Sequence, residues 1–208
     1  MASLRRSQKP LVVEHKPNFP LGGLFFDELY IPKTKTVIPE RRVLFDETFV
    51  SKFSKGGREI KGYNIEYDEP EHYSCGYGKI FGDQNKKVQY YDNPFVVVLT
   101  RGNEAIAFAS YNIIRDTIEI GQIQGTYGKG EELKELFWGR AIISAIEEIA
   151  KSQRAKRIVV KSAKNSKYEE IRGNSNGGEA GFLIYDVNAK RCGFRRNNIT
   201  GNYEKEID

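Results

Sequence analysis

Apolar residues recur with two different spacings in the middle of the chain, and these spacings predict its central elements. A continuous apolar run predicts a buried strand at 95–99, and a second strand at 105–114 is expected to pair with it antiparallel. A third strand is predicted at 117–123. Apolar residues spaced three and four apart then predict a helix with one buried face at about 131–152, and the next apolar run predicts a short strand at 157–162.

The last three of these elements form a strand, a crossover helix and a strand. A crossover helix returns the chain to the edge from which it started, so the two strands of such a βαβ unit lie parallel. We therefore expect strands 117–123 and 157–162 to be parallel neighbours. The predicted fold class is α/β in the broad sense (α+β), with a mixed, mostly antiparallel sheet and a central βαβ crossover.

One strand breaks the alternation of apolar and polar residues. Ile118 and Ile120 share a face, but the next apolar residue, Ile123, has the opposite parity. An extra residue accommodated as a β-bulge at Gly121 would restore the alternation. The alternative is a strand that is buried on both faces, and the sequence leaves both interpretations open.

The N-terminal part of the chain has a different composition. Five prolines lie before residue 40, which excludes a long helix, and an apolar patch at 24–31 is expected to pack on the rest of the protein. We predict a proline-rich arm at 1–55, packed on the body as a structural strap, and a main domain at 56–208. Residues 43–53 predict a strand or a short helix, and three phenylalanines spaced four apart favour the helix.

Composition restricts the class of protein. A chain of 208 residues with 39% hydrophobic residues can bury a core, and its longest apolar run is too short to span a membrane. The N-terminus lacks the apolar stretch of a signal peptide, and two cysteines favour a reducing cytoplasm over a disulfide scaffold. With two histidines and two cysteines, we expect no metal site. The formal charge of +5 is compatible with nucleic acid or a phosphate-rich cofactor, without requiring either.

A loop at 71–78 gathers an imidazole, a thiol and hydroxyl groups. Loops positioned by a rigid scaffold often carry binding and catalytic residues. His72 is therefore a candidate for contact with substrate, against the alternative that it belongs to an ordinary surface loop.

The order of elements resembles the GNAT family of N-acyltransferases over about residues 94–207. The closest local match is Gly193-Phe194 followed by Tyr203, Lys205 and Ile207 at alternate positions. The resemblance implies that the thioester arm of acetyl-CoA, or of another acyl-CoA, lies where the bulged strand separates from its parallel neighbour. It also implies that the diphosphate sits at the N-terminus of the crossover helix, where free N–H groups and the helix dipole favour an anion.

The loop at 124–130 departs from the family pattern. In that pattern, a Gln or Arg is followed by two residues of any type, then a Gly, one residue of any type, and a Gly or Ala. In one register Gln124 is followed by Gly128 and Gly130, which is one residue too long. In another, Gly139 is the last glycine, with Lys134 and Phe137 at the two earlier positions. The implied cofactor-binding residues, taken from the first register and from an asparagine after the second parallel strand, are Gln122, Ile123, Gln124, Gly125, Gly128, Lys129, Gly130 and Asn165.

Two further residues receive catalytic roles through the resemblance. Glu119 lies in the middle of the predicted bulged strand and is the candidate general base, with an ordinary solvent-facing glutamate as the alternative. The family's general-acid tyrosine would fall at Ala189. Tyr185, one helical turn earlier, is the candidate replacement, with a core tyrosine as the alternative.

Three functions are consistent with these features. The first is an acyl-CoA-dependent N-acyltransferase that acetylates an amine on a small molecule or a macromolecule. The second is a nucleic-acid-modifying member of the same fold, because some phage DNA-modification proteins carry features similar in kind to His72-Tyr73 and to Tyr185 with Asn188. The third is a binding or structural protein without catalytic activity.

Overall fold

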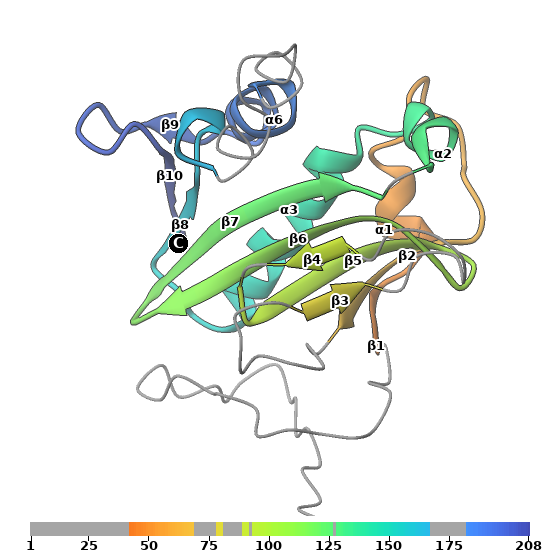
Figure 1. Cartoon of the computed structure of the whole chain (residues 1–208), viewed down its shortest axis with the longest axis horizontal. Coiled ribbons are helices and arrows are strands. Elements are labelled where there is room, and N and C mark those ends of the chain that lie inside the picture. The colour runs from red at the N-terminus through yellow and green to blue at the C-terminus, as the bar shows by residue number, and fades with distance from the viewer. Residues whose placement is uncertain (1–41, 69–77, 81–88, 92, 127, 167–181) are drawn as a thin grey trace, which may run out of the picture.

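The structure is a computed structural model that describes residues 42–68, 78–80, 89–91, 93–126, 128–166 and 182–208. Its centre is an eight-stranded sheet with the order β1-β2-β5-β6-β7-β8-β10-β9 (Figure 1). β7 and β8 are parallel, and the other pairings among these eight strands are antiparallel. The predicted fold class and the parallel pair are confirmed. The strands are β1 (Arg42–Phe45), β2 (Tyr63–Asp68), β5 (Phe95–Arg101), β6 (Glu104–Ile114), β7 (Thr117–Gly125), β8 (Arg157–Val160), β9 (Arg195–Arg196) and β10 (Tyr203–Glu206).

Of the two interpretations that the sequence left open for β7, the structure contains the β-bulge. Along β6 and β7, Tyr111 is opposite Ile120 and Ser110 is opposite Gln122, so Gly121 is the additional residue. This extra residue turns Ile123 to the same buried side as Ile120, and both belong to the main hydrophobic core. The shift in parity along the sequence therefore marks the bulge.

The helix predicted at 131–152 is interrupted, so this part of the prediction is wrong. Residues Gly130–Lys134 form α2, and Trp138–Ser152 form the longer α3. Between them the backbone pairs with residues 53–55 instead of continuing the helix: Phe137 N–H donates to the Phe53 carbonyl, and Lys55 N–H donates to the Glu135 carbonyl, each at 2.9 Å. The apolar spacing continues across the break, which is why the sequence did not reveal it.

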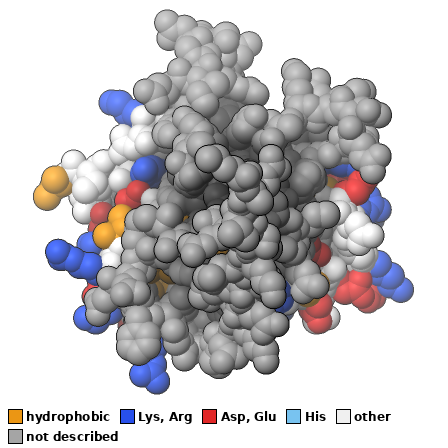
Figure 2. Space-filling model, turned by 60° about the horizontal axis from the view of Figure 1, so that its bottom comes forward, with side chains coloured by type: hydrophobic (Ala, Val, Ile, Leu, Met, Phe, Trp, Pro, Cys, Tyr) orange, Lys and Arg blue, Asp and Glu red, His pale blue; other side chains and the backbone are white. Residues whose placement is uncertain are grey.

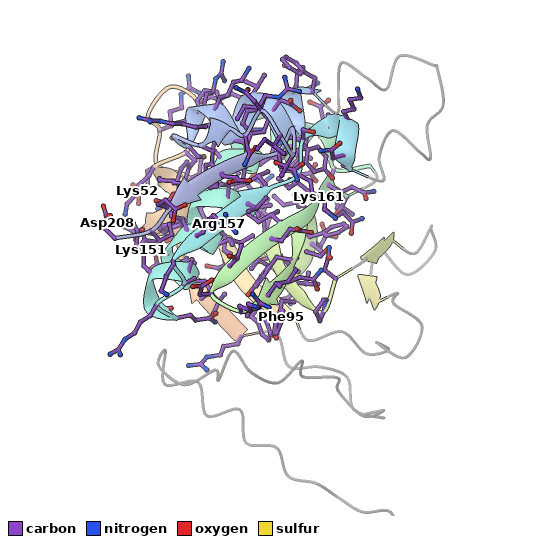
Figure 3. All side chains as sticks on the ribbon, turned by 90° about the vertical axis from the view of Figure 1, so that its left-hand side faces the viewer. Lys52, Phe95, Lys151, Arg157, Lys161 and Asp208 are labelled. Atoms are coloured by element: carbon purple, nitrogen blue, oxygen red, sulfur yellow. The ribbon has the colours of Figure 1, made fainter. Side chains whose placement is uncertain are left out.

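Helix α3 covers one face of the sheet, behind it in Figure 1. Its buried residues join the strand residues in the main core; on α3 they are Ala141, Ile142, Ile143, Ala145, Ile146, Ile149 and Ala150. The small hairpin of β3 (Gly78–Ile80) and β4 (Gln89–Tyr91) lies on the other side of the sheet in Figures 1 and 3.

The segment before β2 contains both elements that its sequence allowed. Residues Arg42–Phe45 form β1, which pairs with β2, and Glu47–Ser51 form α1. Asp46 caps α1 by accepting hydrogen bonds from the N–H groups of Thr48 and Phe49. Most of the predicted arm lies outside the described residues, and the domain boundary at residue 55 stays a prediction.

The C-terminal part completes the sheet next to β8. After the short 3-10 helix η2 (Ala163–Asn165), a π-helical turn, η3 (Leu183–Val187), runs directly into α6 (Asn188–Arg191). β10 then pairs with β8 on one side and with β9 on the other. Within the described residues, no helix is long and apolar enough to cross a membrane.

Candidate functional site

Strands β7 and β8 separate at the bulge. Their paired residues end at Ile120 and Val160, and the next hydrogen bond, from Lys161 N–H to the Ile120 carbonyl at 3.1 Å, is the last between them. β7 continues to Gly125 alongside β6, whereas the chain after β8 turns into η2. The backbone of β7 beyond Gly121 therefore has one edge that β8 does not cover.

A buried asparagine explains why the bulge contains glycine. A Cβ atom at Gly121 would lie 2.8 Å from Asn93 Nδ2, which is closer than real Cβ contacts. Asn93 cannot move freely, because its amide donates to Ser110 Oγ and accepts from Asn112 Nδ2, each at 2.8 Å. Glycine at 121 thus allows a polar cluster to lie directly against the point where the strands part.

Tyr185 lies at the uncovered edge of β7. Its hydroxyl oxygen accepts a hydrogen bond from the Ile123 N–H at 2.9 Å, and the side chain is buried in the main core. The Ile123 N–H is therefore directed away from β6, toward the side on which β8 has separated. π-Helical turns such as η3 often occur at functional sites, because the extra residue re-aims the side chains that follow.

The neighbouring residue, Asp186, contacts the opposite side of the separation. Its buried carboxylate accepts from the Ala163 N–H at 2.8 Å and from the Tyr203 hydroxyl at 2.9 Å. Burial, followed by this hydrogen bond and the Asp186 charge, raises the pKa of Tyr203. Sequence analysis missed Asp186, although a lone carboxylate among Leu183, Ile184 and Val187 was a usable signal.

Glu119 lies beside the separation but on the other face of the sheet. Its backbone is between Ile118 and Ile120, which face the core, so its side chain is directed away from the cluster that contains Tyr185. Its carboxylate forms an ion pair with Lys161 at 3.1 Å, and both side chains are partly exposed. Figure 3 shows Arg157 and Lys161 at the two ends of β8.

The two glutamines of β7 belong to the same polar face. Ser110 Oγ donates to Gln122 Oε1 at 3.2 Å, and Gln122 Nε2 donates to Gln124 Oε1 at 3.1 Å. With Asn93 and Asn112, these groups form a continuous chain of hydrogen bonds across β6 and β7. The outer face at the bulge is therefore polar, with the Glu119–Lys161 ion pair beside this chain, whereas the inner face is apolar.

The loop at Gly128 has room for a phosphate group but an unfavourable charge. A Cβ atom at Gly128 or Gly130 would meet nothing within 4 Å, so open space lies beside both glycines. Lys129, however, forms ion pairs with Glu104 at 2.6 Å and Glu132 at 3.8 Å, and α2 begins with two glutamates. Carboxylates in the first turn oppose an anion at that helix end. This loop does not fit the diphosphate of coenzyme A.

Gly125 and Gly139 have roles in packing. A Cβ atom at Gly125 would lie 2.8 Å from Leu133 Cδ1, and one at Gly139 would lie 2.5 Å from Asn188 Nδ2. Gly139 is in the first turn of α3, as the second loop register requires, but the Asn188 side chain covers it. Neither alignment of the loop with the family pattern, at Gly128 and Gly130 or at Gly139, therefore provides a diphosphate-binding site of the family type.

Asn165 uses its amide to hold a turn. Its Nδ2 donates to the Thr200 carbonyl and to Asn202 Oδ1, each at 2.8 Å. His72 lies outside the described residues. No group of three or more histidine, cysteine or acidic side chains that could hold a metal occurs in the part of the chain that the structure describes.

No family model and no curated protein matches this chain. The solved structures that match this chain include the following two. One is assigned to the GNAT family of acetyltransferases, from Desulfovibrio desulfuricans, with 14% identity over 82% of this chain and 98% of its own, at a TM-score of 0.38. The other is assigned as a streptothricin acetyltransferase from Bacillus anthracis, in complex with acetyl coenzyme A, with 14% identity over the same shares and a TM-score of 0.37. Likeness at this level does not identify a family or an activity.

Proposed function

We propose that this chain is an N-acyltransferase that takes an acyl group from a thioester of the coenzyme A type and transfers it to an amine. The observation that supports this most directly is the Ile123 N–H at the uncovered edge of β7, with the Tyr185 hydroxyl as its partner. A backbone N–H held rigidly in a strand can stabilise negative charge that develops on a carbonyl oxygen during acyl transfer.

Each residue has a defined part in this proposal. The Ile123 N–H exchanges its bond to Tyr185 for one to the carbonyl oxygen of the thioester. The amine nitrogen forms the new bond to the carbonyl carbon, and the carbon–sulfur bond breaks. The Tyr185 hydroxyl, released from Ile123, gives its proton to the leaving sulfur and later recovers one from solvent.

Glu119 is the proposed acceptor of the proton that the attacking ammonium must lose. Its ion pair with Lys161 keeps the carboxylate at the point where the strands separate, on the polar face next to Asn112. The amine would therefore approach from this polar face, opposite the core side that Tyr185 occupies. Glu119 acts directly or through one water, a range that general bases commonly use.

In this proposal the acyl-CoA donor is bound mainly through its thioester end. Open space at Gly128 and Gly130 admits the rest of a coenzyme A molecule, but the carboxylates around Lys129 give the diphosphate no favourable partner. We infer that the acyl-pantetheine portion supplies most of the binding. Gln122, Gln124 and Asn165 stay candidates for cofactor binding through the family resemblance. His72 stays a candidate for contact with substrate because of the loop in which it lies.

Nuclear magnetic resonance of amide-labelled protein tests the proposal at its central atom. Titration with acetyl-CoA should shift the Ile123 amide resonance more than those of buried core amides such as Ile143. Tyr185→Phe is the matched variant, because it frees the Ile123 N–H while keeping the ring, and it should bind the thioester at least as tightly. An Ile123 resonance that does not move at millimolar acetyl-CoA would rule out this function.

A further inference from the structure

An isoleucine projects from the turn that joins β9 and β10. Ile199 is 97% exposed, whereas the other large hydrophobic residues on the described surface reach 53% at most. The turn extends away from the sheet in Figure 1, beyond the labels β9 and β10. A solitary apolar side chain at a turn contributes nothing to the core, so packing gives no reason for its presence.

The turn holds Ile199 in a fixed position. Asn197 Oδ1 accepts from the N–H groups of Ile199 at 2.8 Å and Thr200 at 3.2 Å. The Asn197 N–H donates to the Asn202 carbonyl, and the Gly201 N–H donates to the Asn197 carbonyl, both at 2.8 Å. Gly201, with φ +74°, provides the left-handed backbone that closes the turn.

The same turn is attached to the candidate site. Asn165 donates to the Thr200 carbonyl and to Asn202 Oδ1, and the Ser162 N–H also donates to Asn202 Oδ1 at 3.2 Å. Residues 162–165 directly follow β8, where it has separated from β7. Ile199 is therefore presented by a rigid segment fixed to the rim of the strand separation.

Positive charge surrounds the base of the turn. Arg195 and Arg196 form β9 and are exposed, and Arg191 is exposed at the end of α6. No ion pair of these three arginines occurs among the described residues. The nearby carboxylate of Glu204 is engaged by Arg157 at 3.7 Å and by Asn197 at 3.0 Å. Figure 2 shows basic and acidic side chains together along the margins of one face of the molecule.

We propose that the β9–β10 hairpin binds double-stranded DNA, with Arg195 and Arg196 on the phosphates and Ile199 as a wedge against a base step. Proteins that bend or open a duplex insert a single apolar side chain in this way, between cations that hold the backbone. Charge complementarity favours a polyanion, and the apolar tip favours the faces of bases. An anionic membrane fits less well, because one isoleucine flanked by Asn198 and Thr200 inserts little apolar surface.

This inference stands on the hairpin alone and does not rest on acyl transfer.

Fluorescence anisotropy with a labelled 20-base-pair duplex, at several salt concentrations, tests the arginines. Binding should weaken with salt, and Arg195→Ala with Arg196→Ala should reduce the slope of log K against log salt by about 1.8, which is two phosphate contacts. The control removes two exposed arginines elsewhere, Arg42→Ala with Arg58→Ala, and should keep the slope. Equal slopes for both double variants, or no duplex binding at 50 mM salt, would overturn the proposal.

A duplex containing 2-aminopurine tests the wedge. Wild-type protein should raise its fluorescence by unstacking the base, and Ile199→Ala should abolish that rise and weaken binding about 10-fold without changing the salt slope. Ile114→Ala, at an isoleucine 53% exposed on β6, is the matched control. An unchanged signal in Ile199→Ala, or binding to anionic vesicles but not to DNA, would contradict the wedge.

Discussion

Tyr185 and Asp186 are adjacent in the chain, yet they contact the two sides of the strand separation. The Tyr185 hydroxyl accepts from Ile123 of β7, and the Asp186 carboxylate accepts from Ala163, just beyond β8. In a regular helix, consecutive side chains diverge by about 100°. The π-helical turn places this pair so that one segment holds both strands apart.

Asp186→Ala should lower the free energy of unfolding by roughly 2–4 kcal/mol, because it leaves the Ala163 N–H and the Tyr203 hydroxyl without an acceptor in a buried place. Asp186→Asn is the control, since its amide oxygen can accept from Ala163 while its nitrogen donates to the tyrosine oxygen. Urea unfolding with unchanged m-values would measure both. Similar midpoints for the two variants would show that these bonds contribute little.

Stability should fall above about pH 10, in part because of Tyr203 and Tyr111. Burial raises the pKa of both phenols in the folded protein, with the Asp186 carboxylate adding to the effect at Tyr203. Below the unfolded value of about 10, both phenols are neutral in either state, and their stabilisation is fully present. As pH rises further, the unfolded chain loses protons that the folded protein retains, which favours unfolding.

Tyr203→Phe isolates part of this effect. The variant should be less stable at pH 8 by about 1 kcal/mol, through loss of the bond to Asp186, and its stability should decline less steeply between pH 9 and 11. Urea titrations at each pH give the free energy of unfolding, and from these values its slope against pH is obtained for the variant and the wild type. Parallel slopes for variant and wild type would show that Tyr203 titrates alike in both states.

Gly121→Ala should destabilise the protein by about 1–3 kcal/mol, because the added methyl group would displace Asn93 from its buried hydrogen bonds. Gly130→Ala, where the space is open and φ is ordinary, should change stability by less than about 1 kcal/mol. Combining Gly121→Ala with Asn93→Ser should cost less than the sum of the two. Strict additivity would indicate that the alanine and the asparagine do not meet.

Acetyl-CoA and acetyl-pantetheine should bind with affinities within a few-fold of each other. In the described part of the loop, residues 128–130, the cation available to the diphosphate is Lys129, which Glu104 and Glu132 already neutralise. Glu131→Gln with Glu132→Gln should improve the affinity for acetyl-CoA while leaving that for acetyl-pantetheine unchanged. Isothermal titration calorimetry measures the affinities of acetyl-CoA and acetyl-pantetheine for each variant. Acetyl-CoA binding a hundredfold tighter, and lost in Gly130→Val, would instead establish a diphosphate site at the loop.

Glu119→Gln should lower the rate of acyl transfer by about 10²-fold at neutral pH, the usual effect of removing a general base. The loss should shrink toward pH 10, where free amine becomes abundant. Glu148→Gln, at an exposed carboxylate of α3 away from the strand separation and the Gly128 loop, is the control and should keep the wild-type profile. Full activity of Glu119→Gln from pH 6 to 10 would show that another group accepts the proton of the attacking ammonium.

The sequence predicted those features that depend on neighbouring residues. The parity of Ile118, Ile120 and Ile123 offered the bulge as one of two interpretations, and the structure contains it. Tyr185 lies at the strand separation, and its catalytic role stays a prediction. The interruption between α2 and α3 escaped prediction because it depends on pairing with residues 53–55, which lie 80 or more positions away in the sequence. Likewise, Asn188 covering Gly139 joins segments that only the folded chain brings together.

The position of β10 between β8 and β9 has a consequence for how the protein is made. Residues 203–206 supply the outer neighbour of β8, so a nascent or truncated chain that stops before them leaves that strand with a free edge. Exposed edges of apolar strands recruit other chains and aggregate. Residues 203–206 therefore protect the centre of the sheet from association with other chains.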